Sequence, residues 1–340
     1  MMKNVTKYFS FFILFISAET FAEWWHDDWK FHKALQVDIS GIGEADAADR
    51  FPVLVKLSGG NFSYFMDVLP KGEDLRFIAA DQQTPLKYHI EKYDPLTEIA
   101  LIWVQVPKTG QAVTTGPVTT ETIYMYYGNQ EAVSAEDIAG VYDVNQAIVY
   151  HFDAVAGPRD ATAYENHPAA FSGELLAAGL INGAGRFDAS SVLQLPNSPT
   201  LEYQAEQGLS LSFWLNLDRV DDVARLLSIT GPSAMSIDNE AGALRVVMGA
   251  NGNELANEVT PVLLSNGVWH HLGLSIGPEQ TIVYVDGKVA ASLPGVSAPM
   301  APSIAVGYSP EQSGFVGNVD EFQVSNVQRH RSWFTSTLMS

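Results

Sequence analysis

Apolar and polar residues alternate with a period of two through most of the chain. Residues 209–217 (LSLSFWLNL) show this most clearly, because every second position carries Leu or Phe and the others carry Ser, Trp or Asn. Successive side chains of a strand point to opposite faces of a sheet, so the pattern is typical of a strand with one buried face. Residues 51–57, 122–127, 268–276 and 281–285 repeat it. The sequence therefore predicts an all-β protein.

The strand-like runs fall into two groups. Residues 131–147 separate them and are small and acidic, without an alternating stripe. We predict an antiparallel β-sandwich at residues 23–130, a linker with one helical turn at residues 131–147, and a two-sheet jelly roll at residues 148–335. A length of 340 residues fits this division, since a domain takes roughly 150 residues.

Three local patterns add detail to this fold. Asp286 and Gly287 lie between two strand-like runs, and this residue pair favours a type I′ hairpin turn. The apolar run at residues 99–106 is too short to cross a membrane and fits a buried strand. The tail at residues 327–339 is expected to form a short helix.

Residues 1–22 have the features of an export signal. Lys3 and Lys7 give a positive start, residues 9–18 form an apolar run, and Thr20 and Ala22 fit a cleavage site. That run is shorter than the ~20 residues a spanning helix needs. An uncleaved N-terminal anchor is the alternative. We expect an exported protein, periplasmic or at the cell surface, with no transmembrane segment in the mature chain.

Composition excludes several classes of protein. The chain carries 19 Lys and Arg against 39 Asp and Glu, a formal net charge of -20, so it lacks the basic surface that nucleic-acid binding requires. The absence of cysteine excludes disulfides, thiolate metal sites and a cysteine nucleophile. With 46% hydrophobic and 17% charged residues, most of the chain is expected to fold.

The first sandwich contains an ordered set of short motifs. They are Trp29 and residues 51–57 (FPVLVKL), 74–77 (DLRF), 102–107 (IWVQVP) and 124–129 (YMYYGN). With this set, roughly residues 24–130 resemble a bacterial family of exported β domains, domain of unknown function 2341. The resemblance implies no established chemistry.

The second region also contains an ordered set of short motifs, which includes residues 150–152 (YHF), 183–188 (GAGRFD), 211–215 (LSFWL), 283–287 (VYVDG) and 319–322 (VDEF). With this set, the region resembles the laminin-G-like branch of the concanavalin A-like lectins. This resemblance implies a jelly roll that binds a glycan or a protein, and some members of that branch carry a structural calcium.

No enzyme motif is present. None of the 8 histidines lies in a zinc-protease pattern, and there is no phosphate-binding loop or nucleophile elbow. A glycosidase needs two carboxylates about 5 to 9 Å apart, but the adjacent Asp320 and Glu321 are expected to face opposite ways on a strand, as are His270 and His271. We therefore assign no catalytic residue. A carbohydrate-active hydrolase is the alternative, because folding can bring distant acids together.

A structural calcium is the one cofactor that the sequence suggests. Calcium takes six to eight oxygen ligands, and Asp160, Asn166 and Asp320 could supply some of them if closure of the sheet brings them to one rim. The alternative is that Asp160 and Asn166 cap turns through the backbone and that Asp320 bonds a loop.

Aromatic side chains are candidates for sugar binding. Trp214 lies on the more polar face of its strand, and Trp269, Tyr308 and Phe315 are further candidates. Burial in a core is the alternative for each of them.

Together these features predict an exported, non-catalytic binding or accessory protein of the bacterial cell envelope, with a glycan or an envelope protein as its partner. Proteins that resemble this pair of domains often continue into a proton-channel module. That resemblance implies an accessory role in proton-driven (biopolymer) transport, with proton-channel subunits as partners. A structural spacer is a further alternative.

Overall fold

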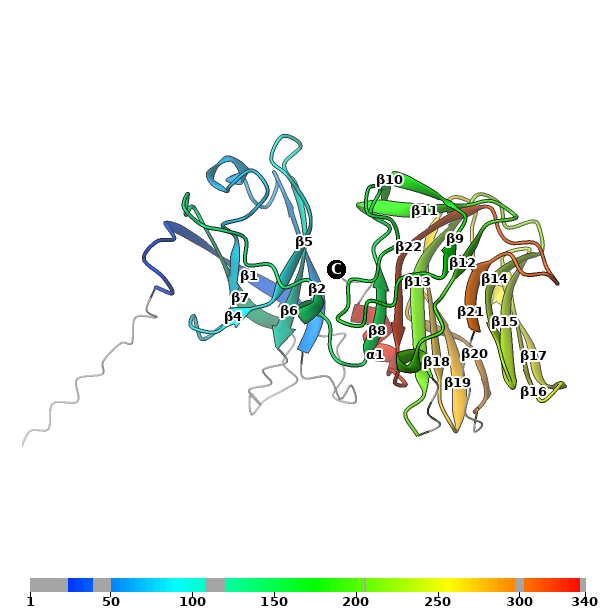
Figure 1. Ribbon diagram of the computed structural model, residues 1–340. Helices are drawn as coiled ribbons and strands as arrows, with labels where there is room; N and C mark the ends of the chain where they lie inside the picture. The colour runs from blue at the N-terminus through cyan, green and yellow to red at the C-terminus, as the bar shows by residue number, and fades with distance from the viewer. Residues whose placement is uncertain are drawn as a thin grey trace, which may run out of the picture.

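The computed structural model describes residues 24–38, 50–107, 120–202, 204, 206–296 and 303–336. Residues 1–22, where export is predicted, lie outside this described part. Within it, no helix combines the length and the apolar composition that crossing a bilayer requires. Two β-rich bodies lie side by side, joined by the segment that follows β7 (Figure 1).

The first body is a small antiparallel sandwich. One sheet has the order β1-β7-β3-β4 and the other β2-β6-β5. Their inner faces enclose an apolar core that includes Leu57, Phe77 and Ile102. A single 3-10 turn, η1 (Phe65–Asp67), follows β2. The strands are β1 (Phe31–Asp38), β2 (Arg50–Ser58), β3 (Arg76–Ile78), β4 (Pro85–Leu86), β5 (Tyr88–Asp94), β6 (Ile99–Pro107) and β7 (Thr120–Tyr127).

The second body is a larger two-sheet sandwich. An eight-stranded sheet has the order β10-β11-β22-β13-β18-β19-β20, with β8 also paired to β22, and a seven-stranded sheet has the order β17-β16-β15-β14-β21-β12-β9. The strands are β8 (Gln146–Tyr150), β9 (Ala170–Phe171), β10 (Glu174–Ile181), β11 (Gly183–Phe187), β12 (Val192–Gln194), β13 (Leu209–Leu217), β14 (Ala224–Thr230), β15 (Ser233–Glu240), β16 (Ala243–Ala250), β17 (Asn253–Val262), β18 (Trp269–Ile276), β19 (Gln280–Val285), β20 (Lys288–Pro294), β21 (Ser303–Gly307) and β22 (Gly317–Ser325).

The period-two prediction is confirmed. The Leu and Phe positions of β13 all enter the core between the two large sheets. Asp286 and Gly287 both have positive φ, at 49° and 67°, and they connect β19 to β20 as a type I′ turn does. Short 3-10 turns, η2 (Ala139–Val141) and η3 (Pro199–Leu201), and one helix, α1 (Arg331–Ser336), complete the described elements.

β6 is buried along nearly its whole length. Ile102 and Val104 face the core of the first sandwich. Leu101 and Trp103 face the other way and pack with Val149 of β8 in the second sandwich. This strand is the apolar run at residues 99–106, and it needs no polar face because both of its faces are covered.

Helix α1 fills the remaining part of the junction. Phe334 stacks on Tyr284 of β19 with ring centroids 4.8 Å apart, and Trp333 packs on Phe51 of β2 at 5.8 Å. Gly273 of β18 lies directly beneath Phe334, where a Cβ atom would come within 2.7 Å of the ring. The outer face of the eight-stranded sheet is therefore shaped to receive the end of the chain.

This fit predicts the outcome of a double-mutant cycle. Gly273→Ala should lower the free energy of unfolding by roughly 1 to 3 kcal/mol, because the added methyl overpacks a buried contact. In a Phe334→Ala background, the same change should cost nothing. Urea denaturation of the four proteins measures this, and an equal cost in both backgrounds would contradict the docking of α1 on Gly273.

Candidate functional site

A groove of about 640 Å³ lies over the solvent-facing side of the seven-stranded sheet. One row of side chains crosses its floor from strand to strand. The row consists of Val247 (β16), Ser236 (β15), Ser228 (β14), Ala305 (β21) and Gln194 (β12). Because the three central positions carry only Ser or Ala, the surface over the middle of the sheet is recessed.

The rim of the groove carries larger groups. Tyr308 follows β21 and is 42% exposed, and Glu311 lies in the same loop. Among the described lining residues, Arg225 is the one cation, and it forms an ion pair with Asp238. The groove thus offers hydroxyls, an amide and one aromatic ring, while its positive charge is already neutralised.

Two further candidates for sugar binding, Trp214 and Trp269, lie on the opposite sheet. Trp214 of β13 is half-buried, its ring 5.2 Å from that of His271, and its indole nitrogen is buried without a hydrogen-bond partner. Trp269 begins β18 on the same side of the sheet. The structure therefore does not bring Trp214 and Trp269 together with Tyr308, and a binding role for each of the three stays a prediction.

Phe315, the fourth aromatic candidate, is part of the core. It is 2% exposed and stacks on Phe187 with ring centroids 5.1 Å apart. The alternative stated for it, burial in a core, is therefore what the structure shows, because the chain turns its ring between the two sheets.

Asp160 and Asn166, predicted as calcium ligands, organise a loop. The Asp160 carboxylate accepts hydrogen bonds from the backbone N–H groups of Val149, Thr162 and Asn166 and from the Thr162 hydroxyl. The Asn166 amide donates to the carbonyl of Ala147 at 2.8 Å. Both carboxylate oxygens of Asp160 therefore already accept hydrogen bonds from within the protein.

Asp320, the third predicted calcium ligand, bonds a different loop. Its carboxylate accepts the N–H groups of Leu180 and Ile181, at 2.9 and 2.8 Å, and that of Glu321 at 2.8 Å. The structure thus does not gather the oxygens of Asp160, Asn166 and Asp320 at one point, and calcium binding there stays a prediction.

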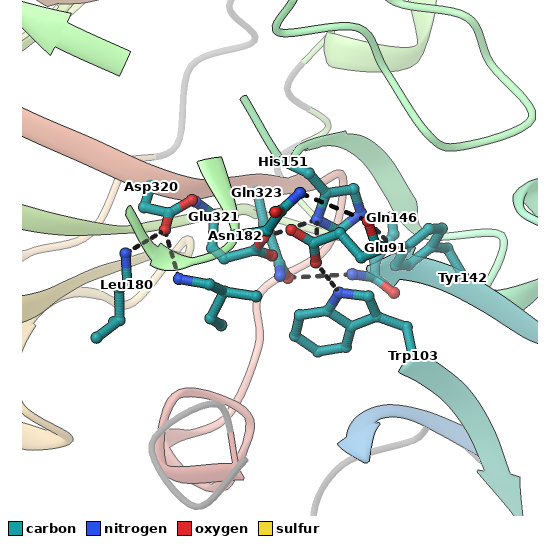
Figure 2. Close-up of polar contacts among 11 residues, drawn as sticks. Glu91, Trp103, Tyr142, Gln146, His151, Leu180, Asn182, Asp320, Glu321 and Gln323 are labelled. Carbon is teal, nitrogen blue, oxygen red and sulfur yellow. Dashed lines mark hydrogen bonds and ion pairs between the residues drawn. The ribbon is translucent and has the colours of Figure 1, made fainter. Parts of the chain in front are cut away.

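A different set of titratable groups converges at the junction of the two sandwiches. Glu91 of β5, His151 after β8 and Glu321 of β22 point toward one another (Figure 2). His151 Nδ1 lies 2.7 Å from Glu321 Oε1 and 3.6 Å from Glu91 Oε2. We call these three residues the junction cluster.

Two β-bulges create the junction cluster. Between Ile90 and Lys92, β5 has one more residue than β6, and that extra residue is Glu91. A second bulge lies in β22 opposite β13, where Glu321 has φ 49°. A bulge re-aims a side chain and interrupts the alternation of faces.

The second bulge corrects an expectation about the two acids of β22. Val319 and Phe322 both enter the core, so the two residues between them, Asp320 and Glu321, both stay out of it. The prediction that these two carboxylates face opposite ways is therefore wrong, because the bulge adds one residue to the outward side.

Burial dominates the electrostatics of the cluster. Burial raises the pKa of Glu91 well above its ordinary value, and the nearby Glu321 raises it further. Burial likewise raises the pKa of Glu321, with partial opposition from the Gln323 amide, and it lowers the pKa of His151. Neutral side chains are thus favoured when nothing else compensates their charge.

Two sequence families match the chain in the expected order. Residues 71–166 match the family described as Domain of unknown function (DUF2341), and residues 187–333 match the Concanavalin A-like lectin/glucanases superfamily. Both resemblances are confirmed. The DUF2341 match continues past residue 130 and includes β8. The second match supports a carbohydrate- or protein-binding role for the larger sandwich.

Three solved structures are among those to which the chain is similar. The binding domain of Paraclostridial Mosquitocidal Protein 1 is 15% identical, with a TM-score of 0.47, and the match covers 57% of this chain and 52% of that one. Domain 4 of an extracellular arabinanase from Geobacillus stearothermophilus, in complex with arabinotriose, is 18% identical with a TM-score of 0.44, over 56% and 97% of the two chains. The botulinum neurotoxin serotype G binding domain is 11% identical with a TM-score of 0.47, over 57% and 50%.

The chain spans about half the length of the first of these structures. No curated protein matches its sequence.

We expect His271, which packs against Trp214, to make the free energy of unfolding depend on pH. Burial lowers the pKa of His271 from 6.5 to about 4, so the unfolded chain takes up a proton at a higher pH than the folded one. The free energy of unfolding should therefore fall as pH drops from about 6.5 to 4, by up to roughly 3 kcal/mol from this residue.

Comparison with His271→Leu isolates this contribution. Urea denaturation at several pH values should give a smaller loss of stability for the variant at acid pH. Parallel curves for the two proteins would show that His271 does not titrate in this way.

Proposed function

We propose that the groove over the seven-stranded sheet binds a neutral glycan, and that the protein is a non-catalytic binding or accessory protein of the cell envelope. The observation that carries this proposal is the row of small polar side chains beside the exposed ring of Tyr308. Sugar hydroxyls bond to such groups, and the C–H face of a sugar packs on an aromatic ring.

The charge of the groove favours a ligand without acidic groups. Arg225 is occupied by Asp238, while Glu254 and Glu311 add negative charge at the rim. An acidic polymer would meet repulsion here without a free cation to offset it. The chain as a whole, at a formal net charge of -20, acts in the same direction.

Binding is favoured over hydrolysis by where the acids lie. Glu254 is on β17 and Glu311 follows β21, strands separated by three others, which places the strands about 19 Å apart. A glycosidase needs its pair about 5 to 9 Å apart. Three acids have a raised pKa: Glu91 and Glu321, whose side chains are 4% and 0% exposed at the junction, and the neighbouring Asp320, which is also buried. A polysaccharide cannot reach them there.

The proposal extends to the cellular location and the partners of the protein. Residues 1–22 support export to the periplasm or the cell surface. The resemblance of the domain pair supports an accessory role beside proton-channel transport subunits. In that setting, the glycan groove would lie on the sheet that faces away from the first sandwich.

Two groove variants test glycan binding. On a glycan array, Tyr308→Ala should weaken the wild-type signal by roughly tenfold or more, and Ser236→Trp should abolish it by filling the hollow. Tyr64→Ala is the matched control, because Tyr64 is an exposed tyrosine of the other sandwich, at 52%. Binding that both groove variants retain would contradict the site, and release of reducing sugar from a polysaccharide would contradict the non-catalytic role.

A further inference from the structure

We propose that Glu91, His151 and Glu321 bind a divalent metal ion of the zinc class, and that this ion ties the first sandwich to the second. Glu91 comes from β5 of the first sandwich, whereas His151 and Glu321 come from the second (Figure 2). The site is distinct from the glycan groove, which lies on the opposite sheet.

The positions of the donor atoms fit an ion. One ligand atom of each residue lies within 4.8 Å of the other two. Donors around a zinc ion lie about 2.0 to 2.2 Å from the metal, so in the usual tetrahedral geometry two of them are about 3.3 to 3.6 Å apart. Donor atoms that all lie within 4.8 Å of one another can reach this spacing through side-chain shifts of roughly 1 Å.

Two carboxylate oxygens of the junction cluster are buried and accept no hydrogen bond. The Glu91 and Glu321 side chains are 4% and 0% exposed. Oε1 of Glu91 and Oε2 of Glu321 are buried without a hydrogen-bond donor. Leaving such a group unsatisfied costs about 1 to 3 kcal/mol or more, and coordination of a metal ion would remove this cost.

The groups around the cluster orient its donors. The Tyr142 hydroxyl lies 2.8 Å from His151 Nε2, so an Nε2–H that donates to Tyr142 leaves the Nδ1 lone pair directed at the two carboxylates. Trp103 Nε1 donates to Glu91 Oε2 at 2.8 Å. A metal-binding histidine is commonly held in this way, through a hydrogen bond on its other ring nitrogen.

In the described part of the chain, no lysine or arginine balances the two carboxylates. Among the described residues, the ion pairs of lysine and arginine all involve other acids, and none reaches Glu91, Asp320 or Glu321. One imidazole with two carboxylates is a mixed nitrogen and oxygen donor set, which suits zinc or cobalt better than calcium, a cation that takes oxygen ligands.

Cobalt provides a direct test on the full chain. Protein freed of metal with a chelator is titrated with Co²⁺ and followed by visible absorption, both as folded protein and after refolding from urea with Co²⁺ present. We expect one bound Co²⁺ with d–d bands that disappear when Zn²⁺ displaces it. Glu91→Gln and Glu321→Gln should lose these bands, and Tyr142→Phe should weaken binding by about 10- to 100-fold.

His26→Gln is the control, because His26 lies beside Asp28 on the surface and should leave Co²⁺ binding unchanged. Circular dichroism shows whether each variant folds. If a carboxylate variant does not fold, the wild-type stoichiometry and Tyr142→Phe decide the outcome. The absence of a bound ion in the wild type by both routes would overturn the proposal, as would binding that is lost in His26→Gln and kept in Glu91→Gln.

Discussion

β6 is covered on both of its faces, and this constraint determines how the two sandwiches meet. Its inward side chains complete the first core, and its outward Leu101 and Trp103 pack in one cluster with the connecting segment at η2, with β8 and with the end of β10. Burial of each such side chain is worth roughly 1.5 to 3 kcal/mol. The two bodies are therefore packed through an apolar sheet face. Any polar group that lies within this junction is desolvated.

The junction cluster follows from that loss of water. Glu91 and Glu321 would meet solvent on an isolated sandwich, whereas here each is enclosed by the other body and by His151. Both are bulge residues, and Glu321 has a positive φ, which residues other than glycine rarely adopt. Strained backbone and buried acids at one place are features that proteins commonly keep for function.

The sequence was sufficient to predict the sheets but not this cluster. Alternation in β13, the Asp286-Gly287 turn and the apolar run of β6 are local, so each could be interpreted from neighbouring residues. A bulge is harder to recognise, because its only trace is a one-residue shift in the alternation, as where Asp320 and Glu321 stand together between Val319 and Phe322. The groove could not be predicted from the sequence for another reason. One residue from each of five strands forms the row on its floor, and these residues become neighbours only through the order of the strands in the sheet.

Because both faces of β6 are covered, the position at which the chain is divided also matters. The DUF2341 segment ends at residue 166, inside the part of the chain that supplies β8 to the larger sandwich. A cut at residue 130 would uncover Leu54, Leu101 and Trp103 together, and an apolar sheet face open to water favours aggregation. Separation of the two sandwiches would therefore require a new cover for these three side chains.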